Sequence, residues 1–189
     1  AEDGIRDVER SRGLGDVYKR QSHNNQRYLE RNLQWGLLLD RKKVEDLLEI
    51  RLMLESQTAR SAARKATTAN LQAMEATILG MRESVDQPEK FLQFDLDFHL
   101  LVAQATQNSI LYNLLSMTRG YLQQWIKESL DDPSTLKARN RAESSIQEHQ
   151  SILQTLWTRH AEKAQQAMTR HILSSSSDLY NHIEQKSDA

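Results

Sequence analysis

Residues that break secondary structure are scarce in this sequence. Its 189 residues include only six glycines and two prolines, which leaves little material for tight turns. Apolar residues recur at intervals of three and four, the spacing of one face of an α-helix, and strict apolar/polar alternation over the length of a strand is absent. The sequence therefore predicts an all-α fold, an antiparallel bundle of about six helices.

The breaks between the predicted helices are short and polar. Pro88 suits the first turn of a helix, Asn108-Ser109 interrupts an apolar stripe, and Asp131-Asp132-Pro133 ends another. The helices are expected to span about 44–66, a segment from 67 or 68 past 81, then 88–107, 110–130, 135–158 and 161–185. Residues 44–189 should thus form one helical domain, preceded by a linker segment over 22–43.

Residues 1–21 do not share this pattern. They hold three of the six glycines, a dense mixture of charges and no sustained helical stripe. We expect them to be either a non-native leader, of the kind read through from a sequencing adapter, or a disordered native tail. In both cases they should carry no function.

Composition excludes several kinds of chemistry. The chain has no cysteine, which rules out disulfides, thiolate metal sites and thiol catalysis. A formal net charge of −1 argues against binding nucleic acid through bulk electrostatics. No apolar run approaches the roughly 18 residues needed to span a bilayer, and no signal peptide is evident. We therefore expect a soluble, cytoplasmic protein with no membrane partner.

The stretch FDLDFH, residues 94–99, places polar groups on an apolar helix face. Asp95 and His99 lie four residues apart, so both point to the same side of their helix, beside the stripe that includes Phe94 and Phe98. A carboxylate is rarely buried unless something pairs with it. The pattern indicates a charged or metal partner inside the bundle.

Two further histidines lie on apolar faces. His149 and His171 are 22 residues apart, about 33 Å along one straight helix. A break near Arg159-His160 lies midway between them, so an αα-hairpin would bring them to the same level. Neutral imidazoles with a carboxylate bind borderline divalent ions, with zinc the first choice and nickel or manganese as alternatives. The competing interpretation is a hydrogen-bonded core in which Asp95 pairs with Arg51 or Arg119.

These segments resemble a known family. VEDLLEIRLMLESQTARSAARKA, FDLDFHLLVAQATQNSIL and EHQSILQTLWTRHAEKAQQAMTRHI are similar to parts of the FCD domain, the ligand-sensing domain of GntR-family transcription regulators of the FadR type. The resemblance implies a six-helix bundle, a central metal bound by Asp95, His99, His149 and His171, a small organic acid effector and a homodimer.

The resemblance also leaves a gap. Family members carry a winged helix-turn-helix before this domain, and nothing upstream of Val44 resembles one. Either the chain is truncated or it is a stand-alone sensor, and in both cases DNA would be bound only through a domain absent from these residues.

Two functions follow as alternatives. The first is an effector-sensing domain that is not an enzyme, with Arg51 as the first choice for the acid and Arg119 and Asn108 as further candidates. The second is a metal-dependent enzyme acting on a small carboxylate. It lacks an obvious general base, because Asp97 and Glu148 adjoin predicted ligands but helical geometry turns each from its neighbour's face.

Overall fold

The computed structural model describes the backbone of residues 41–129 and 136–187 and the side chains of 45–119 and 138–176. The predicted leader over 1–21 and nearly all of the predicted linker over 22–43 lie outside the described residues. The described residues belong to one compact unit.

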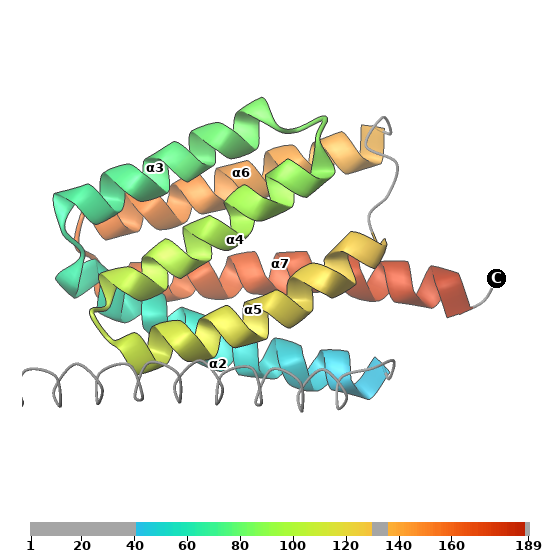
Figure 1. The fold of residues 1–189 in the computed structure, drawn as a ribbon, viewed down its shortest axis with the longest axis horizontal. Helices are drawn as coiled ribbons and strands as arrows, with labels where there is room; N and C mark the ends of the chain where they lie inside the picture. Colours follow the sequence, from blue (N-terminus) through green and yellow to red (C-terminus); the bar gives the residue numbers. More distant parts are fainter. Residues whose placement is uncertain (1–40, 130–135, 188–189) are drawn as a thin grey trace, which may run out of the picture. The chain divides into compact units, whose positions relative to one another are not determined.

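The described residues contain six α-helices and no strand (Figure 1). They are α2 (Arg41–Lys65), α3 (Thr68–Glu83), α4 (Pro88–Ala105), α5 (Ser109–Ser129), α6 (Leu136–Trp157) and α7 (Ala161–Ser187). The predicted all-α bundle of six helices is confirmed, and most predicted helix ends lie within three residues of the observed ones.

The helix ends follow from local side-chain chemistry. Thr67 caps α3 in a capping box with Asn70, and Pro88 occupies the first turn of α4. Asn108 caps α5, because its side-chain oxygen accepts hydrogen bonds from the backbone N–H groups of Ile110 and Leu111. Capping at these positions, together with the scarcity of breakers elsewhere, explains why long helices alternate with short turns.

The helices pack in two groups that share one interior. α3 lies against α4 and α6, whereas α2 lies along α7 and also contacts α5 (Figure 1). Contacts of α4 with both α2 and α5 join the two groups. The middle of α4, where Asp95 and His99 lie, is therefore close to α2 and α5, and the side chain of His99 also reaches α6 and α7.

Small residues allow close packing around this interior. Ala59, Ala62 and Ala63 of α2 are fully buried. At Gly80 of α3, an added Cβ would lie 2.5 Å from a ring carbon of Phe94. The absence of a side chain at this position therefore allows the Phe94 ring of α4 to pack against α3. Among the described residues, no helix is long and apolar enough to cross a membrane.

Candidate metal centre

Four side chains from three helices converge in the interior of the bundle. Asp95 and His99 come from α4, His149 from α6 and His171 from α7. One potential ligand atom of each lies within 4.8 Å of the other three. The structure thus brings together all four residues that the sequence predicted as metal ligands.

The turn between α6 and α7 sets the two later histidines at one level. Arg159 lies in this turn with a left-handed φ of 59°, and its backbone N–H donates to the carbonyl of Leu156. The hairpin brings the rings of His149 and His171 to 4.3 Å between centroids. Both side chains are buried, and His149 also packs edge-on against Phe98 at 4.7 Å.

The distances between donor atoms are short and similar. Nε2 of His99 lies 3.2 Å from Nε2 of His171 and 3.3 Å from Nε2 of His149. Oδ1 of Asp95 lies 3.2 Å from Nε2 of His149 and 3.9 Å from that of His99. Donors that share one zinc ion at 2.0–2.2 Å lie roughly 3.4 Å from one another, so this spacing fits a single ion.

The opposite nitrogen of each ring faces an acceptor. Nδ1 of His99 lies 2.6 Å from Oε2 of Glu55, Nδ1 of His149 lies 2.7 Å from the carbonyl oxygen of Ser145, and Nδ1 of His171 lies 2.8 Å from Oε2 of Glu148. The contacts of His149 and His171 favour the tautomer with the proton on Nδ1, whereas Nδ1 of His99 lies close to the Glu55 carboxylate without hydrogen-bond geometry. In that tautomer the Nε2 atoms of His149 and His171 present lone pairs toward the place that Nε2 of His99 also faces, and a bound cation would stabilise such an arrangement.

The protonation states also suit a metal. Burial, followed by the neighbouring His149, lowers the pKa of His171 to about 4, and burial with the charge of Arg119 holds the pKa of His99 well below its ordinary value. Burial by itself would raise the pKa of Asp95, but the charge of Arg119 opposes this most strongly, and that pKa lies well below the ordinary value. His99 and His171 are therefore neutral and Asp95 is charged at neutral pH.

Arg119 of α5 connects the centre to two other helices. One terminal nitrogen donates to Oδ2 of Asp95 at 2.8 Å, and the other donates to Oε2 of Glu55 at 3.2 Å. The Nε atom of Arg119 is buried and has no hydrogen-bond partner. The pairing of Asp95 with an arginine, predicted as an alternative to metal binding, is thus present beside the His cluster rather than in place of it.

The other two predicted effector residues have different surroundings. Arg51 is buried, and its Nε donates to Oε1 of Glu55 at 2.8 Å. Asn108 is exposed, and its side-chain oxygen caps α5. Of the three candidates, Arg51 and Arg119 are joined to the centre through Glu55, whereas the side-chain bonds described for Asn108 are local.

Glu55 is the main residue of the centre that was not predicted from the sequence. Its side chain is 1% exposed, although glutamate is rarely buried without partners. Burial alone would raise its pKa, but Arg119 and Arg51 outweigh this and hold the pKa well below its ordinary value. A signal existed, because Glu55 follows Arg51 by four residues on the same stripe as Leu48 and Ala59.

Glu148 requires a correction. Its position in the sequence indicated no role at the centre, because helical geometry turns it from the face of its neighbour His149. That geometry does not prevent a contact with the next helix. The Glu148 carboxylate accepts a hydrogen bond from Nδ1 of His171 across the α6–α7 hairpin. Among the described side chains, Glu148 therefore serves to orient the imidazole ring of His171.

The bundle interior thus holds a partly buried aspartate and three buried histidines next to two buried arginines, a concentration of polar groups suited to binding a small ligand. The FCD domain matches residues 46–174 of this chain. The chain belongs to the FCD-domain family, and the resemblance noted in its sequence is confirmed.

Curated relatives of the chain are transcription regulators. The HTH-type transcriptional regulator LutR of Bacillus subtilis (strain 168) is 27% identical over 178 residues, 94% of this chain and 80% of the relative. The galactonate operon transcriptional repressor of Escherichia coli (strain K12) is 27% identical over 164 residues, 82% and 67% of the two chains. The Uxu operon transcriptional regulator of the same organism is 32% identical over 134 residues, 67% of this chain and half of the relative.

Solved structures share the fold. Streptococcus agalactiae GntR superposes with a TM-score of 0.64 at 24% identity, covering 77% of this chain and 64% of that one. E. coli McbR/YncC gives a TM-score of 0.64 at 16% identity, covering 75% and 70%. The three curated relatives are regulators and not enzymes, so the alternative of a metal-dependent enzyme receives no support from them.

Proposed function

We propose that these residues form the effector-sensing domain of a transcription regulator, which binds a divalent metal ion and a small organic acid in the bundle interior. The observation that carries the proposal is the convergence of three buried Nε2 atoms with the Asp95 carboxylate, each opposite ring nitrogen lying within 2.8 Å of an oxygen. Asp95, His99, His149 and His171 would hold the ion. Three imidazoles, one carboxylate and no thiolate favour zinc, with nickel or manganese as alternatives.

The acid site is proposed beside the metal. A carboxylate needs a donor as well as an ion, and the buried Nε–H of Arg119 has no partner. One relative represses an operon named for galactonate, which is itself a carboxylate. Arg51, which lies on the opposite side of Glu55, would add positive charge that attracts the acid. A contact between the acid and Asn108 stays a prediction.

Transmission would run through the helices that the two arginines join. Arg119 bridges α5 to α4 through Asp95 and to α2 through Glu55. An acid that binds Arg119 would weaken the bonds of Arg119 to Asp95 and Glu55. Its binding would then favour one arrangement of α2 and α5 over another. The HTH-type name of LutR supports the proposal that a DNA-binding segment reads this change in the whole protein.

Small organic acids should stabilise the metal-loaded chain. In a thermal-shift screen of acetate, glycolate, succinate and galactonate, we expect at least one acid to raise the melting temperature by about 5–10 °C at a hundredfold excess over its Kd. The methyl esters are the controls, because they keep the shape and lose the charge. If no small acid acts on a chain shown to contain metal, or if the esters act equally, the acid part of the proposal is wrong.

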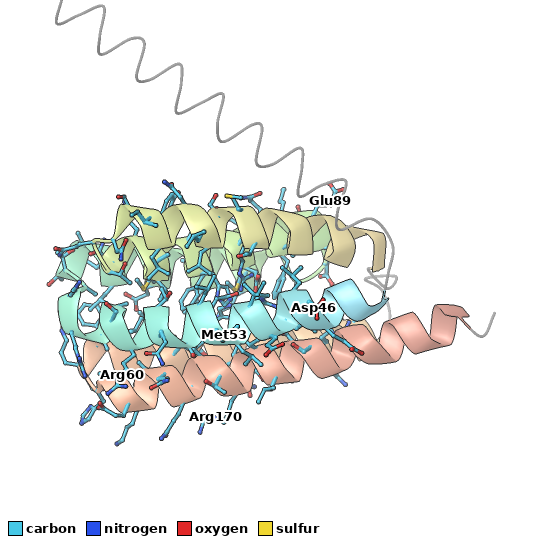
Figure 2. All side chains as sticks on the ribbon, turned by 90° about the horizontal axis from the view of Figure 1, so that it is seen from below. Asp46, Met53, Arg60, Glu89 and Arg170 are labelled. Carbon is cyan, nitrogen blue, oxygen red and sulfur yellow. The ribbon has the colours of Figure 1, made fainter. Side chains whose placement is uncertain are left out.

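A homodimer is part of the same proposal, since regulators of this class read two half-sites. The outer side of α2 offers a self-complementary surface, with Met53 between Asp46 toward one end of the helix and Arg60 toward the other (Figure 2). Antiparallel pairing of two copies would bring Asp46 near the partner's Arg60, which in its own chain pairs with Glu162.

Light scattering tests this surface with a matched pair of variants. Met53 on α2 and Leu79 on α3 are both 57% exposed. The unaltered chain should be a dimer at micromolar concentration, Met53→Glu should be a monomer, and Leu79→Glu should remain a dimer. A monomeric unaltered chain would contradict the dimer, and a dimeric Met53→Glu would place the interface elsewhere.

A further inference from the structure

Glu55 lies where the metal-binding side and the arginine side of the centre meet. Its Oε2 atom is 2.6 Å from Nδ1 of His99 and 3.2 Å from a terminal nitrogen of Arg119, while its Oε1 accepts from Nε of Arg51 at 2.8 Å. The side chain is 1% exposed, so water hardly screens these contacts. One carboxylate therefore acts on a proposed metal ligand and on both buried guanidinium groups.

The charges around Glu55 balance. Arg51 and Arg119 bring two positive charges, and Glu55 and Asp95 bring two negative ones, within a set of direct contacts. An incoming carboxylate thus meets guanidinium groups that already have carboxylate partners. Neutralising Glu55 alone leaves one buried positive charge uncompensated, and a buried unpaired charge attracts a counter-ion.

The effect on the metal runs in the opposite direction. An acceptor at Nδ1 orients an imidazole and raises the basicity of its other nitrogen, and loss of such a partner commonly weakens metal binding by about 10–100-fold. Glu55 is the carboxylate beside Nδ1 of His99, at 2.6 Å although outside hydrogen-bond geometry, and it adds a negative charge close to the ligand cluster.

We infer that Glu55 is a positioning residue that tightens metal binding and at the same time weakens the binding of small carboxylates. The inference rests on the proposed function of the centre. Glu55 sets the affinity for the effector, because its carboxylate competes with the acid for the guanidinium groups of Arg51 and Arg119. At the same time, Glu55 orients the imidazole of His99 toward the ion.

The variant Glu55→Gln keeps the shape of the side chain and removes its charge. Zinc affinity, measured by competition with a chromophoric chelator, should fall about 10–100-fold. Acetate affinity, measured from the visible absorption of the cobalt-loaded chain, should rise roughly tenfold or more. A purely structural role would weaken both kinds of binding together.

Two variants serve as controls. Glu148→Gln replaces the charged acceptor of His171, which lies 2.8 Å from its Nδ1, with a neutral amide, and no ion pair with an arginine is described for Glu148. It should lower zinc affinity without raising acetate affinity. Glu55→Asp shortens the side chain but keeps the charge, so it too should weaken zinc without strengthening acetate, and it provides the test if Glu55→Gln does not fold.

The outcomes separate the inference from the proposed function. An unaltered chain that binds neither zinc nor acetate contradicts the proposed function itself. If the unaltered chain binds both, the inference is overturned when Glu55→Gln fails to gain acetate affinity. The inference is also overturned when Glu148→Gln or Glu55→Asp gains as much acetate affinity as Glu55→Gln. A gain confined to Glu55→Gln, together with weaker zinc binding, supports it.

Discussion

Replacement of His149 by alanine is expected to remove stoichiometric metal from the purified chain. His149 is fully buried, and its Nε2 lies 3.3 Å from that of His99 and 3.2 Å from Oδ1 of Asp95. Without it, two imidazoles and one carboxylate remain, and the cavity left against Phe98 costs additional stability. Elemental analysis and thermal unfolding with and without a chelator measure the two effects.

Chelation distinguishes metal loss from cavity formation. A metal present at a thousandfold excess over its Kd adds about 4 kcal/mol to the free energy of unfolding, so the chelator should lower the melting temperature of the unaltered chain. The His149→Ala variant should be insensitive to it. His160→Ala, at an exposed position in the α6–α7 turn, is the matched control and should keep both metal and chelator sensitivity. Full metal content in His149→Ala would contradict the proposal that His149 is a ligand of the metal.

Replacement of Arg119 by methionine is expected to be strongly destabilising and to abolish the response to acids. Arg119 is 3% exposed and compensates the buried carboxylates of Asp95 and Glu55. Removing one partner of a buried ion pair costs about 3–5 kcal/mol, because the remaining charges lose their compensation. For a domain of this size that corresponds to a melting temperature roughly 6–20 °C lower. Methionine keeps the apolar stem of the side chain and removes the guanidinium group, so the loss reports mainly on that group.

Arg139→Met is the control for this substitution. Arg139 also makes a two-pronged pair, with Asp86 at 2.7–3.0 Å, but both side chains are more than half exposed. A solvent-exposed pair contributes about 0–1 kcal/mol, so the variant should unfold close to the unaltered chain and keep its acid response. An acid-induced stabilisation that survives in Arg119→Met would show that Arg119 does not bind the effector.

The two variants test the two halves of the centre separately. His149 contributes to the cluster of Nε2 atoms, whereas Arg119 contacts the carboxylates on the α2 and α5 side. Metal content should survive in Arg119→Met, since the four proposed ligands are intact. A chain that loses metal in both variants would indicate that the arginine acts chiefly by orienting Asp95.

The sequence by itself determined the helices. Periodicity and capping act over one or two turns, so Pro88, Asn108 and the apolar stripes were sufficient to place six helices near their observed bounds. Local geometry also placed Asp95 and His99 on one face, because residues four apart in a helix must be neighbours. The symmetric spacing of His149 and His171 about a short turn then made their convergence predictable.

Only the tertiary structure decided which charged residues enter the centre. Arg51, Glu55 and Arg119 each lie beside an apolar stripe, where a long polar side chain either extends to solvent or turns inward. The choice depends on how α2 and α5 are rotated against α4, and that rotation follows from packing between helices far apart in the sequence. For the same reason, the contact of Glu148 with His171 arises across a hairpin, where the spacing of residues along one helix carries no information about it.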